Sequence, residues 1–415
     1  MGCSPAERTP APESAATDPL ARAAQIHAQA WVMDAHADIE LLDAPSPYVG
    51  ADGLSQVAPA KMRAGGVDMV VMSAAVGPMP RTAQGYADAR QRADLEIQAI
   101  RDLVADADNN AVLARSVGDL EAAHSAGKLA FLLGMQNALI LGTDVDSLDE
   151  MYAAGVRVFA LTHMGHNDFA DSSRPLFDGD KGTHEPEAEH GGLSSLGRAA
   201  IGRINDLGAL VDISQLSKQA ALQVIELSRA PVIASHSNVR GVTDVSRNLS
   251  DEELRALAAK GGVIHIAPFR GYLFDSNDAE LDRNIRAARV AAGVAEDFYY
   301  PFELYWEIDD PEARSAFTGA ISDLLGPGSV DAMIDHIDYA VQLVGVDHVG
   351  IGTDFNHGSR VEGFADASQA LNVTIGLLER GYSEAQIKKI WGENFLRVFA
   401  AAQADSRHDG EMAER

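Results

Sequence analysis

From residue 31 onward, short apolar runs alternate with longer segments in which apolar residues recur at helical spacing. The chain has eight such runs, at residues 31–38, 67–76, 129–136, 156–163, 209–215, 231–236, 263–267 and 348–354. Helices are predicted between them over residues 85–107, 195–207, 250–260 and 329–343. This alternation is typical of buried parallel strands that are connected by helices.

Eight strand–helix units predict an α/β fold, a (β/α)8 TIM-type barrel with insertions. The competing architecture is a doubly wound open sheet, which the number of runs disfavours. We expect a single barrel domain over residues 23–402, which ends in an amphipathic helix at residues 383–402 that carries Trp391 and Phe395. Residues 1–22 are predicted to form a disordered tether and residues 403–415 a disordered tail.

Two long insertions interrupt the alternation, one after strand 4 and one after strand 7. Residues 165–192 are rich in Gly, Asp, His and Glu, and residues 270–328 contain an aromatic stretch at 298–306. Loops that follow barrel strands lie on the catalytic face, so both insertions are candidates to shape a substrate pocket. For the aromatic stretch, packing on a barrel helix is an equally good interpretation.

The charge of the chain restricts its partners. It has 33 Lys and Arg against 61 Asp and Glu, which gives a formal net charge of -28. Such a surface repels nucleic acids and anionic lipids, so we expect neither as a partner. The barrel region contains no apolar segment of about 18 residues, the length that a membrane-spanning helix requires.

Cys3 is the only cysteine, and it follows Gly2 and precedes a tract rich in Ala, Pro, Glu, Ser and Thr that extends to Pro19. This beginning resembles a mature bacterial lipoprotein, in which a lipidated cysteine leads through a flexible tether to the folded domain. We therefore expect an extracytoplasmic, periplasmic lipoprotein that meets the membrane only through lipid on Cys3. An ordinary disordered tail is the alternative. N-myristoylation at Gly2 is disfavoured because residue 6 is Ala.

Polar residues that could bind a ligand stand at or near the ends of seven of the eight runs. A single histidine in a core strand is more often a hydrogen-bonded core residue than a ligand. The carboxyl ends of barrel strands share one face, however, and active sites lie there, so the recurrence indicates a functional site. In chain order these residues are His36 and Asp38, Gln136, His163, Gln215, His236, His265 and Asp354.

His36 and Asp38 are the strongest metal candidates among these residues. They are two residues apart on a predicted strand, so their side chains project from the same face and can bind one ion. Asp354 joins them because the first and last strands of a closed barrel are neighbours, and His357 follows closely enough to reach the site. Six further histidines are expected mainly at the surface, namely His27, His124, His166, His184, His190 and His408.

The same residues occur in ordered motifs that resemble the membrane dipeptidases, also called renal dipeptidases, of the metal-dependent amidohydrolase superfamily. The resemblance extends from residue 31 to the closing helix. The motifs are Asp34-Ala35-His36-Ala37-Asp38, Leu161-Thr162-His163, Gly192-Leu193-Ser194, Ala230-Pro231-Val232-Ile233-Ala234-Ser235-His236-Ser237, Ser246-Arg247-Asn248 and His348-Val349-Gly350-Ile351-Gly352-Thr353-Asp354-Phe355.

The resemblance implies a role for each residue. In the family, a first-strand His and Asp bind one zinc ion and a sixth-strand His binds a second. A fourth-strand His and a downstream Arg hold the substrate, and an eighth-strand Asp acts on the attacking water. The equivalents here are His36, Asp38 and His236 for the metal, His163 and Arg247 for the substrate, and Asp354 as the proton acceptor and a further candidate ligand. Asp354 and His163 are the predicted catalytic residues.

Two positions depart from the family pattern. Where the family has a bridging glutamate on the third strand and a histidine on the fifth, this chain has Gln136 and Gln215, which are neutral and weaker ligands. Two zinc ions carry four positive charges, but Asp38, Asp354 and one hydroxide supply only three negative ones. We therefore expect one zinc ion per chain, with Gln136 and Gln215 as weak ligands of an empty or weak second site.

The leading hypothesis is a metal-dependent hydrolase that cleaves dipeptides, in which a metal-activated water attacks the peptide carbonyl. One alternative is a mononuclear-metal barrel enzyme that acts on another small amide or a lactone. Another is a catalytically decayed binding protein. The expected partner is a small peptide substrate, and a homodimer is compatible with the sequence.

Overall fold

The computed structural model describes residues 18–41, 44–46, 48–50, 52–178, 183–293, 308 and 310–407. Eight parallel strands follow one another around a barrel, and their order agrees with the order of the eight predicted runs. They are β1 (Met33–Asp38), β2 (Met69–Ala75), β4 (Leu129–Gln136), β5 (Val156–Ala160), β8 (Leu210–Asp212), β9 (Ile233–Ala234), β10 (Val263–Ile266) and β11 (Val349–Ile351).

The ring closes between its first and last strands. A parallel bridge joins Ala37 to Phe355, and the backbone N–H groups of Asp38 and Asp354 donate to the carbonyls of Phe355 and His36, each over 2.9 Å. The predicted (β/α)8 barrel is therefore confirmed. A ninth strand, β3 (Ala111–Ala114), pairs with β4 outside the ring. We did not predict it, because its four apolar residues follow directly on a helical segment.

The four helices predicted between the runs are present, each within two residues of the expected bounds: α3 (Ala83–Ala105), α6 (Ser195–Asp206), α8 (Asp251–Ala259) and α11 (Val330–Val344). Helix α8 begins with a capping box, in which Ser250 accepts from the backbone N–H of Glu253 and the Glu253 carboxylate accepts in return. The other helices around the barrel are α2 (Pro59–Gly65), α4 (Val117–Ser125), α5 (Ser147–Ala154), α7 (Lys218–Leu227) and α12 (Leu371–Glu379).

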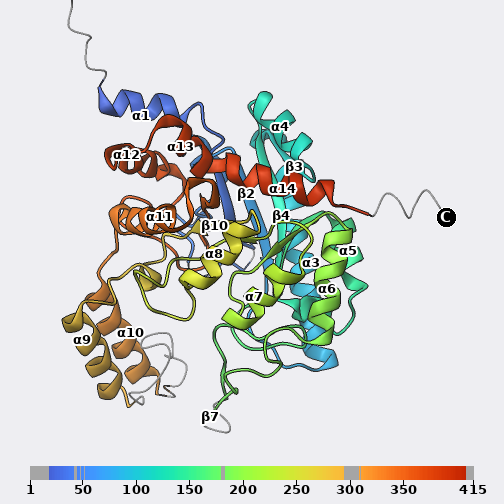
Figure 1. Ribbon diagram of the computed structural model, residues 1–415, viewed down its shortest axis with the longest axis vertical. Coiled ribbons are helices and arrows are strands. Elements are labelled where there is room, and N and C mark those ends of the chain that lie inside the picture. Colours follow the sequence, from blue (N-terminus) through green and yellow to red (C-terminus); the bar gives the residue numbers. More distant parts are fainter. Residues whose placement is uncertain are drawn as a thin grey trace, which may run out of the picture.

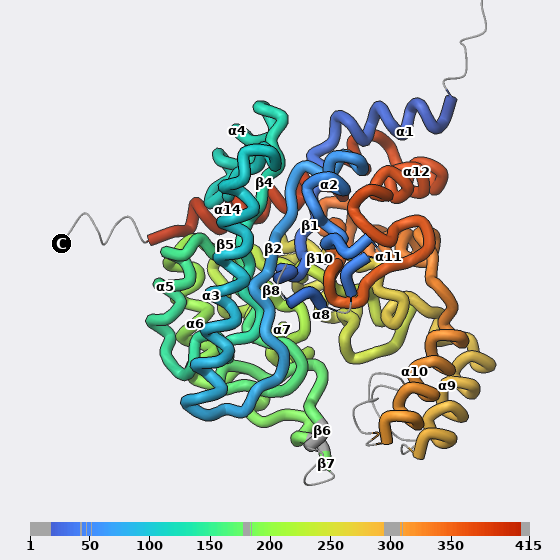
Figure 2. Tube along the Cα trace, turned by 180° about the vertical axis from the view of Figure 1, so that it is seen from behind, coloured from blue at the N-terminus to red at the C-terminus, as the bar shows by residue number. Residues whose placement is uncertain are grey.

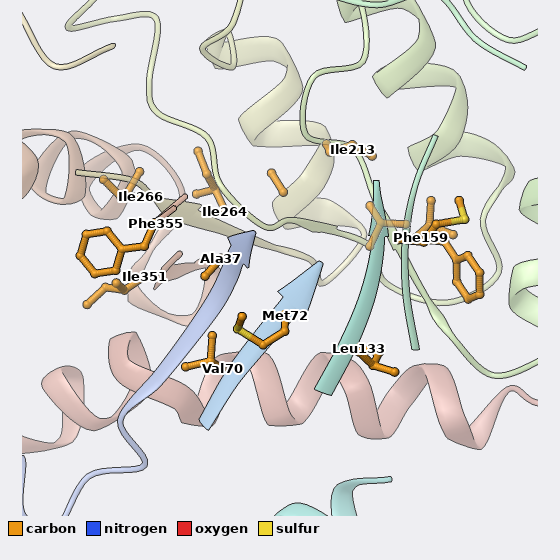
Figure 3. Packing of buried hydrophobic residues seen from close by; sticks show 14 of the residues in the cluster. Ala37, Val70, Met72, Leu133, Phe159, Ile213, Ile264, Ile266, Ile351 and Phe355 are labelled. Atoms are coloured by element: carbon orange, nitrogen blue, oxygen red, sulfur yellow. The ribbon is translucent and has the colours of Figure 1, made fainter. Parts of the chain in front are cut away.

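Two apolar layers hold the barrel together. Alternate strand residues point outward and pack against the surrounding helices, among them Val70, Met72, Leu133 and Phe159 (Figure 3). Residues at the beginnings of the strands, such as Met33, Met69, Ala130 and Val158, point inward and form a second cluster. The helices thus bury one face of each strand, and the barrel interior buries the other.

The predicted closing helix covers the amino-terminal end of the barrel. It consists of α13 (Glu384–Lys388), a π-helical turn (Lys389–Glu393) and α14 (Asn394–Ala404). Trp391 and Phe395 are buried, and Phe395 belongs to the inner cluster with Phe399. Because this end is closed by apolar side chains, the opposite end, where the strands finish, is the one open to a ligand.

The two domain boundaries differ slightly from the expected ones. Helix α1 (Pro19–His27) begins before residue 22, because Asp18 accepts from the backbone N–H of Leu20 as an N-cap and Pro19 occupies the first turn. Helix α14 extends past residue 402 to Ala404. The disordered segments predicted at residues 1–22 and 403–415 are therefore too long by these residues, and the rest of both segments lies outside the described part of the chain.

Part of each insertion extends beyond the barrel (Figures 1 and 2). The first carries a small hairpin of β6 (Phe177–Asp178) and β7 (Thr183–His184). The second carries α9 (Ala279–Ala291) and α10 (Pro311–Leu325), which pack together around a cluster of their own. The aromatic stretch at 298–306 lies outside the described residues. Within the described chain, no helix has both the length and the apolar character needed to cross a bilayer.

Candidate metal centre

Three of the predicted ligands meet at the carboxyl-terminal mouth of the barrel. The ligand atoms of His36, His236 and Asp354 all lie within 4.8 Å of one another, and all three residues are buried. The imidazole rings of His36 and His236 stack, with their centroids 3.7 Å apart. His36 lies on the first strand, and His236 and Asp354 follow the sixth and eighth strands of the barrel. The fold therefore brings together the ends that were expected to meet.

A bulge in β1 directs His36 into the barrel. Asp34 pairs with Val70 and Ala37 with Met72, so three steps on β1 oppose two on β2. Simple alternation from the inward-facing Met33 would point residue 36 outward, and the extra residue reverses this. His36 and the later Asp38 consequently share the inner face, with His36 Nε2 3.2 Å from Asp38 Oδ1.

Asp38 lies between two histidines. Its second oxygen, Oδ2, is 2.9 Å from His357 Nδ1, so His357 reaches the site as anticipated. Burial raises the pKa of Asp38, but the charges and hydrogen bonds of His357 and His36 outweigh it and lower the pKa below its usual range. Burial disfavours the charged form of His357. The neighbouring Asp38 carboxylate favours it more strongly, so the pKa of His357 is raised to about 9.

A hydrogen-bond relay fixes the tautomer of His236. The Ser235 hydroxyl donates to Asp212 Oδ2 over 2.5 Å and accepts from His236 Nδ1 over 2.7 Å. Since Nδ1 carries the proton, the Nε2 lone pair of His236 faces the centre, which is the form that binds a metal. Ser235 Oγ also lies 3.3 Å from His36 Nδ1, so one hydroxyl supports both histidines.

Gln136 and Gln215 both reach this histidine. Their side-chain nitrogens lie 3.1 and 3.3 Å from His236 Nε2. The Gln215 oxygen accepts from the guanidinium of Arg174, a buried residue of the first insertion. Gln215 has φ +68° and Asp354 has φ +57°. This left-handed backbone conformation is uncommon for residues other than glycine and often marks functional positions.

The two predicted substrate-binding residues lie beside the centre. Burial, followed by the charge of His357, lowers the pKa of His163 well below its usual value, and the rings of these two histidines meet edge to face at 5.2 Å. Arg247 is buried and donates to the carbonyl of His236 over 2.7 Å and to Ser237 Oγ over 3.1 Å. These bonds use two of its five N–H donors.

A pocket of about 140 Å³ opens next to His163, His357 and Asp38. Its wall is mixed, with apolar Ile39, Ala75 and Val76 beside the polar residues Glu40, Ser46, Tyr48, Arg92, Glu96 and Asn356. Burial raises the pKa of Glu96 to about 8. The pocket therefore offers hydrogen-bonding groups and room for a small ligand beside the candidate ligands.

Several histidines are not where the sequence suggested. His265 does not reach the mouth, because it lies within β10 and packs in the barrel against Gly350 and Phe395. Its Nδ1 donates to the Ala234 carbonyl, and burial lowers its pKa to about 4. The prediction that His27 and His166 lie at the surface was also wrong, because both are buried and hydrogen-bonded.

Neither His124 nor His190 belongs to the group of ligand atoms at the centre. His124 is half-buried and stacks on Trp31, and His190 is partly exposed in the first insertion. The side chain of His184 and all of His408 lie outside the described residues. Two residues that support the site were missed: Asp212, for which a carboxylate within an apolar run was an available signal, and Arg174, for which there was none.

The donor set fits one divalent metal ion. His36 Nε2 faces a carboxylate oxygen of Asp38, and two lone pairs can face each other at 3.2 Å only if they share a proton or a cation. Two imidazole nitrogens with the oxygens of Asp354 and Asp38 form the nitrogen and carboxylate set that zinc and similar ions accept. The second metal site of the family lacks such a donor set here. Gln136 and Gln215 occupy the positions of its ligands, and both direct amide nitrogens toward His236.

Known proteins with similar sequences include dipeptidases. Dipeptidase aclJ of Aspergillus oryzae is 29% identical over 287 residues, 68% of this chain and 54% of that protein. Dipeptidase tcpJ of Claviceps purpurea is 28% identical over 312 residues, 75% of this chain and 59% of that protein. The chain thus spans less than two thirds of the length of these two relatives.

Solved structures resemble the whole fold. The probable dipeptidase PvdM from Pseudomonas aeruginosa is 35% identical, with a TM-score of 0.83 and coverage of 94% of this chain and 99% of that one. A metallopeptidase from Rhodobacter sphaeroides, bound to a phosphinate mimic of L-Ala-D-Ala, is 21% identical, with a TM-score of 0.68 and coverage of 89% and 99%. At 21% identity, the similarity to the Rhodobacter sphaeroides protein supports the fold of this chain and nothing further.

The family assignment rests on a match over nearly the whole chain. Residues 20–411 match the membrane dipeptidase family, peptidase family M19. The barrel, the ordered motifs and the convergence of His36, His236 and Asp354 agree with it. The chain belongs to the membrane dipeptidase family.

Proposed function

We propose that this chain is a metal-dependent hydrolase of dipeptides. The observation that carries the proposal is the group of His36, His236 and Asp354, whose ligand atoms lie within 4.8 Å of one another at the mouth of the barrel. The dipeptidases among its relatives support the substrate class. A metal ion held there, with zinc as the proposed ion, would polarise the peptide carbonyl and acidify an attacking water.

Each remaining step falls to a residue of the chain. Asp354 accepts the proton of the attacking water, because it is a carboxylate at the centre itself. Arg247 offers its free N–H donors to the substrate carboxylate, for which a planar guanidinium is well suited. His163 is held neutral by burial and can hydrogen-bond a substrate oxygen. The pocket beside His163 and His357 accommodates the other end of a dipeptide.

Turnover of a panel of L,L and L,D dipeptides, before and after removal of metal with a chelator, tests this proposal. We expect cleavage that is lost on chelation and restored by zinc. Asp354→Asn should lower kcat by about 10²-fold or more, as expected for loss of a general base, while Asp282→Asn on exposed α9 serves as the matched control. Cleavage of small amides or lactones in place of any dipeptide would contradict the proposed substrate class.

We also propose that Cys3 carries a lipid that holds the enzyme at the periplasmic face of a membrane. The support is the sequence Gly2-Cys3-Ser4 and the tether-like tract that follows it. Mass spectrometry of the amino-terminal peptide from protein expressed in a bacterial host tests this. An unmodified Cys3 in membrane-extracted protein would contradict it.

A further inference from the structure

Arg174 lies at the centre, although neither the motifs nor the family resemblance assigns it a role. It belongs to the first insertion and is buried. One guanidinium nitrogen donates to the side-chain oxygen of Gln215, and another donates to Tyr272 Oη over 3.1 Å. Bonds at two of its nitrogens hold the guanidinium plane in one orientation.

The contact with Arg174 determines how Gln215 is oriented. A guanidinium has no hydrogen-bond acceptor, so the amide atom that it contacts is the oxygen. The Gln215 nitrogen must then point the other way, and it lies 3.3 Å from His236 Nε2. The oxygen that could have bound a metal is therefore engaged by Arg174, and an N–H donor faces the position next to His236.

The charge at this position is also unfavourable for a second cation. A guanidinium stays protonated at every physiological pH, and only the amide of Gln215 separates it from His236. Arg247 adds another buried guanidinium, 5.5 Å from the Tyr272 ring to whose hydroxyl Arg174 donates. Gln136 contributes an amide in place of a carboxylate, so a second cation would have to share Asp354 and Asp38 with the first.

We propose that Arg174 takes the place of a second metal ion, by supplying a fixed positive charge beside His236 and by engaging the oxygen of Gln215. The centre then holds one metal ion, and its second electrophilic group is an arginine. This inference deepens the proposed function, since the guanidinium would stabilise negative charge that develops on the substrate during hydrolysis.

Metal counting tests the proposal without any substrate. Protein is loaded with excess zinc, desalted and measured by elemental analysis. We expect one equivalent in the wild type and in Gln136→Glu/Gln215→His, which restores the family's ligands but retains Arg174. Addition of Arg174→Gln to that double variant should raise the count to two equivalents. Addition of Arg174→Lys should leave it at one, because lysine keeps the positive charge.

The matched control is Arg198→Gln in the same double variant. Arg198 is an exposed arginine of α6 that contacts Gln223. Its substitution by Gln therefore removes the same charge at a distance from the centre. Its count should remain at one. Two equivalents in the double variant with Arg174 intact would overturn the proposal, and this result does not depend on whether Arg174→Gln folds. One equivalent in the folded triple variant, with folding checked by thermal melting, would overturn it as well.

Kinetics give a second readout for Arg174 in the wild-type background. Arg174→Gln should lower kcat for dipeptides by about 10²-fold with a smaller change in KM, as for loss of an oxyanion donor, and Arg174→Lys should restore part of it. An unchanged kcat would overturn the electrophilic role. Because the metal count needs no turnover, a chain that cleaves no dipeptide could still bear out the exclusion of a second ion.

Discussion

Replacement of Ser235 by alanine isolates the effect of a single hydroxyl on metal binding. Ser235 Oγ accepts from His236 Nδ1 over 2.7 Å, lies 3.3 Å from His36 Nδ1 and donates to Asp212 over 2.5 Å. Without it, His236 loses the partner that keeps its proton on Nδ1. The ring can then carry the proton on Nε2, and that proton must leave before a metal binds.

The size of the effect follows from these contacts. Loss of a partner that orients a ligating histidine typically weakens metal binding by about 10–100-fold, or about 1.4–2.7 kcal/mol. The free energy of unfolding should fall by about 1–3 kcal/mol, because a buried donor and a buried acceptor both lose a partner. Asp212 retains the backbone N–H groups of Ser214 and Ser235, each at 2.9 Å, which limits the loss.

Competition with a chromophoric chelator gives the zinc dissociation constant, and urea denaturation gives the stability. Ser228→Ala is the matched control, because Ser228 is also buried and donates to a carbonyl, that of Ala230, over 2.7 Å, away from the centre. It should cost stability without changing zinc affinity. If Ser235→Ala bound zinc within about twofold of the wild type, the relay would not be what orients His236.

Three further measurements probe other parts of the molecule. Burial lowers the pKa of His336 to about 3, so the unfolded chain binds its proton at a higher pH than the folded one. The free energy of unfolding should therefore fall by about 2 kcal/mol from this group as the pH drops from 7 to 5. In urea denaturation of His336→Asn, the fall over the same pH range should be smaller by about 2 kcal/mol. Ser250→Ala removes the capping box of α8 and should reduce the free energy of unfolding by about 1 kcal/mol, whereas no loss would mean that packing alone fixes this helix start. Chelation should lower the free energy of unfolding by about 2.7 kcal/mol relative to protein at a zinc concentration 100-fold above its dissociation constant, and identical urea midpoints would argue against a bound ion.

The sequence predicted the barrel well because parallel strands that are buried on both faces leave continuous apolar runs. It also placed His36, His236 and Asp354 together, since the ends of such strands share one face. His265 shows the limit of that reasoning. It occupies an apolar run like the others, yet it points into the interior beneath the centre and contacts Gly350 and Phe395.

Other features depend on contacts between distant parts of the chain. Arg174 meets Gln215 and Tyr272, which lie 41 and 98 residues away in the sequence. No periodicity or local spacing encodes such an encounter. The interior position of His27, which contacts Thr374 and Gly65, likewise depends on how helices α1 and α12 meet. The sequence alone therefore brought the candidate ligands together, but it did not indicate the contacts of Arg174 and His27.

The bulge in β1 means that the two halves of one strand serve different parts of the protein. Met33 and Ala35 belong to the inner apolar cluster that includes Phe395 and Phe399 of α14, whereas His36 and Asp38 serve the centre. A deletion of one residue between Asp34 and Ala37 would remove the bulge and leave two steps on each strand, so the residues on both sides of it could keep their pairing with β2. The extra residue therefore lets one strand present consecutive side chains to the barrel interior, so that an apolar end and a metal-binding end occupy the same strand.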